Sequence, residues 1–298
     1  MRTALTAVSE RRRKGRTPFR QRRRSAERIA ALGVEMDLVR PEEVMHHVTE
    51  AVQDGRSWCI ANHNAHSVYL SQKDPEFAAF FDTADVIELD STPIIFFTQL
   101  LGLHSRPFHR CTYLDWREHF WSLAERNSWR VFYLGGEPGV AQGAADKLLE
   151  RYPGARIASR HGYFDMTPGC AENEAVLAEI SAARPQILFV GMGMPRQEVW
   201  LLRNRHLLPP CVVFSVGAAF DYEAGVQVAA PRWIGRIGFE WLFRLAIDPR
   251  RLFHRYCVES WFLLIPAARD IAAAARAGRL FKGRGVAPLA PREDGAAA

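Results

Sequence analysis

Residues 187–221 read ILFVGMGMPRQEVWLLRNRHLLPPCVVFSVGAAFD, and their pattern indicates the fold class of the chain. Two apolar runs, at 187–190 and 212–216, have the length of buried strands. A glycine-rich turn and a helical segment ending at Pro209 and Pro210 separate them. Strand, turn, helix and strand in this order form a βαβ unit, and α/β proteins bind their ligands in the loops at the strand ends.

The same alternation of strand and helix runs through residues 28–228, after a short strand pair at 29–39. We predict further strands at 58–61, 86–89, 130–134 and 156–159. We predict helices from Pro41 and at 67–81, 94–103, 113–126, 141–152 and 172–183. The pattern indicates an α/β core with a mostly parallel, Rossmann-like sheet covered by helices.

Charge divides the chain into an acidic body with basic ends. Residues 1–28 carry 11 Lys/Arg against 2 Asp/Glu, and residues 230–298 carry 12 against 6, whereas the middle has a net charge of −9. We interpret 1–27 as a disordered basic tail, which is either simply solvated or attracted to anionic lipid. Nucleic-acid binding is not expected, because no recognition motif accompanies the arginines.

The chain changes character after residue 228. Segments 239–244 and 249–256 mix arginines with large apolar residues, and the apolar run at 261–265 extends them, a composition typical of amphipathic helices at a membrane surface. The alternative is a basic helical region packed on the core. We predict a helical, membrane-associating appendage at 229–282 and a disordered tail at 283–298.

The cysteines and the hydropathy indicate a cytoplasmic protein. The five cysteines lie far apart without zinc-finger or redox spacing, as expected for free thiols in a reducing compartment. The N-terminus lacks the apolar segment of a secretory signal, and no apolar run approaches the roughly 20 residues of a membrane span. We therefore expect a peripheral protein on the inner face of the cell membrane.

Several polar residues follow predicted strands and are candidates for a site. Asp90 is either the N-cap of the next helix or a carboxylate that faces a cleft and acts as a general base. Gly135 and Gly136 form either a tight turn or a phosphate cradle. His63 and His66 follow another strand, and each is either structural or a ligand contact.

Several sequence blocks in this order resemble the WecG/TagA/CpsF family of glycosyltransferases over residues 30–262. The most specific blocks are Pro-Arg-Gln-Glu at 195–198, Gly-Ala-Ala-Phe-Asp at 217–221 and Glu-Trp-Leu-Phe-Arg-Leu at 240–245. The resemblance implies an inverting enzyme that moves a sugar from a UDP-sugar to a polyprenyl-diphosphate-linked sugar in surface polysaccharide synthesis. The family usually has Thr where this chain has Asn62, which leaves both a hexose and an N-acetylhexosamine-type donor open.

The resemblance also implies roles for individual positions. Asp90 matches the base, Asp221 the acid near the nucleotide, and Arg110 a basic residue near phosphates. Arg244 and Arg251 match arginines of the appendage that close the site on the acceptor diphosphate. The full set of implied or candidate substrate-binding residues is Asn62, Asn64, Arg110, Gly135, Gly136, Gln197, Glu198, Asp221, Arg244 and Arg251.

No cofactor or metal is expected, because the sequence has no Asp-x-Asp pair and arginines can stabilise the departing UDP. The alternative function is a non-catalytic, membrane-associated protein that binds sugar nucleotides. An enzyme should have Asp90 facing an open cleft together with Asn64 and Gln197. The sequence leaves the oligomeric state open, a homo-oligomer included.

Overall fold

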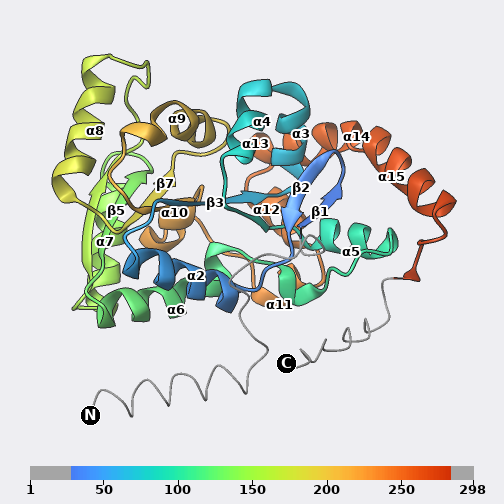
Figure 1. The fold of residues 1–298 in the computed structure, drawn as a ribbon, viewed down its shortest axis with the longest axis horizontal. Helices are drawn as coiled ribbons and strands as arrows, with labels where there is room; N and C mark the ends of the chain where they lie inside the picture. Colours follow the sequence, from blue (N-terminus) through green and yellow to red (C-terminus); the bar gives the residue numbers. More distant parts are fainter. Residues whose placement is uncertain (1–27, 283–298) are drawn as a thin grey trace, which may run out of the picture.

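The computed structural model describes residues 28–282 of the 298-residue chain (Figure 1). The tails at 1–27 and 283–298, both predicted to be disordered, lie outside the described residues. The described chain opens with an antiparallel hairpin of β1 (Arg28–Ala31) and β2 (Val34–Asp37), as the sequence predicts.

A six-stranded sheet forms the centre of the molecule, and every strand pair in it is parallel. Its spatial order is β4-β3-β8-β7-β5-β6. The strands are β3 (Trp58–His63), β4 (Val86–Leu89), β5 (Arg130–Gly135), β6 (Arg156–Arg160), β7 (Ile187–Gly191) and β8 (Val212–Ser215). The predicted α/β class is confirmed, and all six carboxyl ends meet at one edge, where such sheets hold ligands.

Helices cover both faces of this sheet, and the strands are apolar on both sides for that reason. In β5, Val131 and Tyr133 pack into one layer while Phe132 and Leu134 pack into the other. One layer contains α2 (Pro41–Gln53), α6 (Tyr113–Arg126), α7 (Val140–Arg151) and α10 (Ala219–Ala224). The opposite layer contains α4 (Pro75–Asp82), α8 (Ala171–Ala183) and α9 (Arg196–Asn204), seen above the sheet in Figure 1.

A third apolar cluster joins the hairpin to α3 (Ala65–Lys73), α5 (Thr92–Leu100) and α15 (Leu264–Arg276). The fully buried carboxylate of Asp37 fixes the hairpin to the sheet. It accepts hydrogen bonds from Arg28 Nε and Nη2, each at 3.0 Å, and from the backbone N–H of Ile87 in β4 at 2.8 Å. This hairpin therefore supports β4, the strand that ends beside Asp90.

Two predicted helices differ from the structure by more than one residue at an end. The helix expected at 67–81 is divided into α3 and α4 because Pro75 cannot continue α3 and Asp74 caps a new helix. Asp74 Oδ1 accepts from the backbone N–H groups of Glu76 at 2.9 Å and Phe77 at 3.1 Å. The helix expected at 94–103 starts earlier and ends at Leu100, before Gly102 with its φ of 79°.

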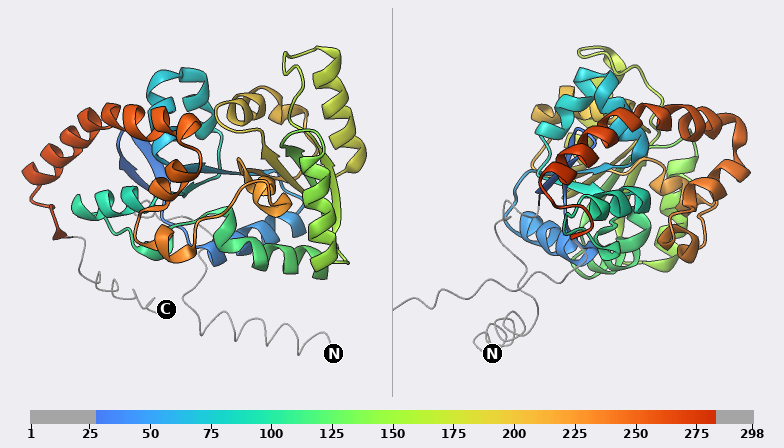
Figure 2. Two further views of the ribbon diagram at one scale, coloured as in Figure 1. Left: turned by 180° about the vertical axis from the view of Figure 1, so that it is seen from behind. Right: turned by 90° about the vertical axis from the view of Figure 1, so that its right-hand side faces the viewer.

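Short helices make up the chain after residue 231. They are α11 (Arg232–Arg236), α12 (Glu240–Ile247), α13 (Pro249–Phe253), the π-helical turn η3 (His254–Val258) and α14 (Glu259–Phe262), followed by α15. Figure 2 shows this orange and red segment running along one side of the molecule, and α15 packs near the hairpin and α5. Within residues 28–282, no helix is long and apolar enough to cross a membrane.

Candidate active site

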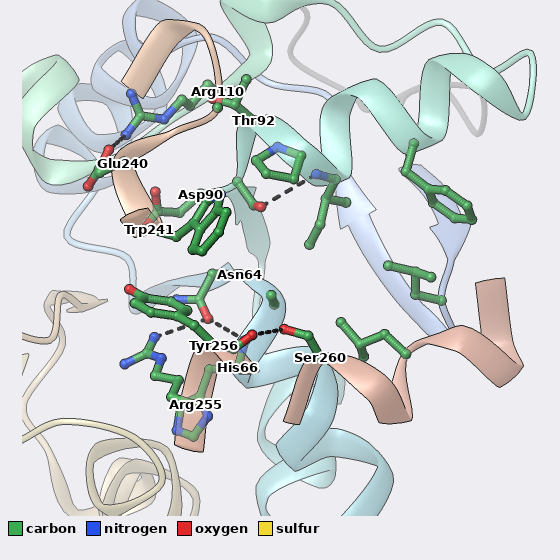
Figure 3. A pocket seen from close by; sticks show the side chains of 18 of the residues that line it. Asn64, His66, Asp90, Thr92, Arg110, Glu240, Trp241, Arg255, Tyr256 and Ser260 are labelled. Carbon is green, nitrogen blue, oxygen red and sulfur yellow. Dashed lines mark hydrogen bonds and ion pairs between the residues drawn. The ribbon is translucent and has the colours of Figure 1, made fainter. Parts of the chain in front are cut away.

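A cavity of about 500 Å³ lies where the carboxyl ends of β3 and β4 meet the C-terminal helices (Figure 3). The core contributes Asn64, Asp90 and Arg110, and the C-terminal helices contribute Glu240, Arg244 and Arg255. The volume falls in the range of roughly 300–1,000 Å³ that is typical of small-molecule sites. The cavity is thus built from two parts of the chain that are distant in sequence.

Asp90 lines this cavity and does not cap the following helix. Ser91 is the N-cap of α5, and its Oγ accepts from the backbone N–H of Ile94 at 3.4 Å. The backbone N–H of Asp90 donates to the carbonyl of His63 at 2.8 Å, which holds the residue in line with the neighbouring strand. Of the two interpretations of Asp90, the structure therefore favours the carboxylate that faces a cleft.

Burial raises the pKa of Asp90 to about 6, because its carboxylate loses solvation. The guanidinium of Arg110 acts in the opposite direction, and the carboxylate of Glu240 adds to the increase. A carboxyl group with this pKa is mostly ionised at neutral pH and is more basic than an ordinary aspartate. This balance suits a general base.

Two of the three arginines of the cavity share a single carboxylate. Arg110 Nη2 lies 2.5 Å from Glu240 Oε2, and Arg244 Nη2 lies 2.6 Å from Glu240 Oε1. Arg110 follows η1 (Pro107–His109) of the core, whereas Glu240 and Arg244 belong to α12. Glu240 thus joins the core to the appendage, and the three arginines outnumber the two carboxylates of the cavity.

Asn64 is held in place from both sides. As the N-cap of α3, its Oδ1 accepts from the backbone N–H groups of His66 at 3.0 Å and Ser67 at 3.1 Å. Arg255 Nη2 reaches the same oxygen at 3.5 Å. Because the oxygen is committed to the protein, the side-chain amide nitrogen is the atom that Asn64 can offer to a ligand.

The two histidines differ in role. His63 is buried, stacks on Phe81 with 3.9 Å between ring centroids, and shares a 2.9 Å hydrogen bond with Ser67 Oγ. Burial lowers its pKa to about 3, so it stays neutral and structural. His66 lines the cavity, and its Nδ1 lies 2.5 Å from Glu259 Oε2 of α14, a second link between core and appendage.

A second group of predicted residues gathers at the ends of β5, β7 and β8. A side chain at Gly135 is excluded, because a Cβ there would lie 2.3 Å from the carbonyl oxygen of Gly191. Gly136 has a φ of 67°, and a Cβ at this position would lie 3.6 Å from Asp221 Oδ1. Burial raises the pKa of Asp221, Glu137 adds to this, and the charge of Arg251 opposes it. Arg251 of α13 is exposed, its Nε lies 2.5 Å from Asp248 Oδ2, and it is not among the residues that line the Asp90 cavity.

Gln197 and Glu198 do not line the Asp90 cavity, contrary to the arrangement expected for Gln197. Both are fully buried, and Gln197 Nε2 donates to Glu198 Oε1 at 2.7 Å. Gln197 Oε1 accepts the backbone N–H of Gly217 at 3.1 Å. Asn62 Nδ2 similarly donates to the carbonyl of Ser215 at 2.7 Å. These side chains hold the loop after β8, which leads to Asp221, and direct contact of any of them with a donor stays a prediction.

Sequence reasoning missed part of the cavity wall. Glu240, Trp241, Arg255 and Tyr256 line it, and none of them was named as a site residue, although Arg244 of the same segment was. A signal was present in the spacing of Glu240 and Arg244, since an i,i+4 ion pair marks one helix face as charged within an otherwise apolar segment. That pattern does not reveal that the charged face turns toward Asp90.

Comparison with known proteins agrees with the resemblance found in the sequence. The model of the family "Glycosyl transferase WecG/TagA/CpsF family" matches residues 29–277. Similar curated proteins include the N-acetylglucosaminyldiphosphoundecaprenol N-acetyl-beta-D-mannosaminyltransferases of Staphylococcus aureus strains NCTC 8325, MRSA252 and MW2. Each is 26% identical over 235 residues, which cover 78% of this chain and 89% of the relative. The chain belongs to the WecG/TagA/CpsF family of glycosyltransferases.

Proposed function

We propose that this protein transfers a sugar from a UDP-sugar to a sugar carried on a polyprenyl diphosphate, with inversion at the anomeric carbon. The observation that supports this most is the placement of one carboxylate, Asp90, in a cavity with three arginines. The Staphylococcus aureus relatives are named for a mannosaminyl transfer to an undecaprenyl-diphosphate-linked acceptor. Their names support the same acceptor class for this chain.

The chemistry assigned to Asp90 is a single displacement. A hydroxyl of the acceptor sugar attacks C1 of the donor sugar, and its proton passes to the carboxylate of Asp90. The new C1–O bond forms as the bond between C1 and the UDP oxygen breaks, so the leaving group departs as UDP and the configuration inverts. General base catalysis of this kind contributes about 10²- to 10⁴-fold.

The arginines are assigned to the phosphates. Arg110, Arg244 and Arg255 line the Asp90 cavity and would hold the acceptor diphosphate, whereas Arg251 lies outside this cavity and pairs with Asp248. We assign Gly135, Gly136 and Asp221 to the nucleotide side. Guanidinium groups in a partly dehydrated site stabilise phosphate charge by charge-assisted hydrogen bonds. Both a hexose and an N-acetylhexosamine-type donor are compatible with this assignment.

The appendage is proposed to dock on an anionic membrane surface at the cytoplasmic face. Large apolar side chains of this segment are exposed, with 62% of Trp233, 69% of Trp261 and 64% of Ile265 accessible. Arginines such as Arg250 and Arg269 lie among them and are also exposed. Exposed aromatic and basic residues together are what an interfacial helix presents to lipid. Docking would bring the cavity to a lipid-borne acceptor.

Replacing Asp90 by Asn should lower kcat for sugar transfer by about 10²-fold or more, because the amide cannot accept the proton. UDP-sugar binding, measured by calorimetry, should change less than threefold or so, since the side-chain shape is kept. The matched control is Asp82→Asn, an exposed carboxylate at the end of α4, which should keep full activity. Retained turnover in Asp90→Asn would overturn the base assignment.

The rate of transfer should depend on pH through the ionisation of Asp90. The base is active when deprotonated, so kcat/KM should be flat above pH 7 and decrease below a pKa near 6, with a loss of roughly tenfold at pH 5. Both substrates are diphosphate diesters whose charge is constant over this range. The same decrease of kcat/KM at low pH should persist in His66→Gln. A decrease that disappears in His66→Gln, or a flat pH profile of the unaltered protein, contradicts the assignment of the base to Asp90.

Membrane docking should depend on the exposed apolar residues of the appendage. The double variant Trp261→Ser/Ile265→Ser should lose at least roughly tenfold in partitioning to vesicles that contain phosphatidylglycerol, measured by sedimentation. The matched control replaces two exposed apolar residues of the core, Tyr163→Ser/Leu207→Ser, and should bind like the unaltered protein. Equal partitioning of both double variants would reject docking through the appendage.

A further inference from the structure

The Asp90 cavity has an apolar end that the transfer chemistry does not use. Six apolar residues line it: Leu32, Ile94, Phe97, Leu263, Leu264 and Ala267. They come from the turn of the hairpin, from α5, and from the region where α15 begins. Protein interiors seldom leave lined spaces much larger than a water molecule, so an open apolar volume beside a charged one calls for an occupant.

We propose that the apolar end formed by these six residues is a slot that binds the first isoprenyl units of the acceptor lipid. The inference rests on the proposed function and deepens it. A polyprenyl-diphosphate sugar has a hydroxyl, a diphosphate and an apolar chain. The single cavity presents a matching carboxylate, a group of arginines and this apolar wall.

Charge and apolarity are arranged to suit one molecule of this kind. Arg110, Arg244 and Arg255 attract a diphosphate, whereas the hairpin turn, α5 and the start of α15 contribute no charged residue to the lining of the cavity. A ligand with a short polar body would leave the slot unfilled. A ligand with an apolar chain directly attached to its diphosphate fills both ends, and burying the chain is favourable at roughly 25 cal/mol per Å².

The slot also leads toward the surface proposed to face lipid. Leu264 lines the slot and is 56% exposed, and its neighbour Ile265 is exposed as well. On the other wall, Phe96 of α5 is exposed beside Phe97. A chain that leaves the slot here would meet exposed apolar side chains, so the remaining isoprene units can stay in the bilayer while the first units sit in the protein.

The test compares prenyl diphosphates of increasing length as probes, without membranes and below their micelle concentrations. Calorimetry should show that binding to the unaltered protein tightens from dimethylallyl to geranyl to farnesyl diphosphate. Burial of each added isoprene unit should lower the Kd at least about fivefold. Equal affinities for the three probes would overturn the slot, and this measurement needs no variant to fold.

A pair of neighbouring substitutions locates the effect. Ala267→Phe fills the slot and should remove the advantage of farnesyl over dimethylallyl diphosphate while leaving the affinity for dimethylallyl diphosphate unchanged. Ala268→Phe adds the same ring to the exposed side of α15 and should keep the full chain-length dependence. If both variants keep it, the chain binds elsewhere and the slot assignment is wrong.

These measurements separate the slot from the function on which it rests. Chain-length-dependent binding without sugar transfer would sustain the slot and overturn the transferase proposal. Sugar transfer with chain-length-independent binding would sustain the transferase and overturn the slot. Vesicle sedimentation of Ala267→Phe should match the unaltered protein, because the added ring lies inside the cavity and not on the docking surface.

Discussion

The site depends on one carboxylate, Glu240, which binds two arginines from different parts of the chain. Arg110 comes from the core and Arg244 from α12, and both lie within 2.6 Å of Glu240. Two further links hold the same segments together: Thr92 Oγ1 donates to the carbonyl of Gly235 at 2.7 Å, and His66 pairs with Glu259. Without these contacts, Asp90 would stand at the end of an uncovered strand and not in a cavity.

The same contacts set the electrostatics of Asp90. Covering the carboxylate raises its pKa, and Glu240 adds to this, while Arg110, Arg244 and Arg255 lower it. The result is a base that is stronger than a free aspartate yet still ionised near neutral pH. Glu240, Arg244 and Arg255 all belong to the C-terminal helices, so this segment both covers Asp90 and supplies most of the charges that act on its pKa.

Much of the core was predictable from sequence because its signals are local. Strands such as 86–89 are continuous apolar runs, and parallel strands end at one edge, so Asn64 and Asp90 could be placed together before any coordinates. The single helix predicted at 67–81 was wrong because apolar periodicity continues across Asp74 and Pro75, although Pro75 interrupts the helix. Gln197 and Glu198 follow a strand in the same manner as Asp90, yet they turn inward, and only tertiary packing distinguishes the two cases. The pairing of Glu240 with Arg110 spans 130 residues and has no local signal.

The most direct test of this account is a double-mutant cycle between core and appendage, read as kcat/KM for sugar transfer. Arg110→Met and Glu240→Gln should each reduce kcat/KM. The double variant should fall within about threefold of Arg110→Met alone, because both changes break the same contact, the ion pair between Arg110 and Glu240. Losses that instead multiply in the double variant would show that the two residues act independently, and would contradict a site assembled by their contact.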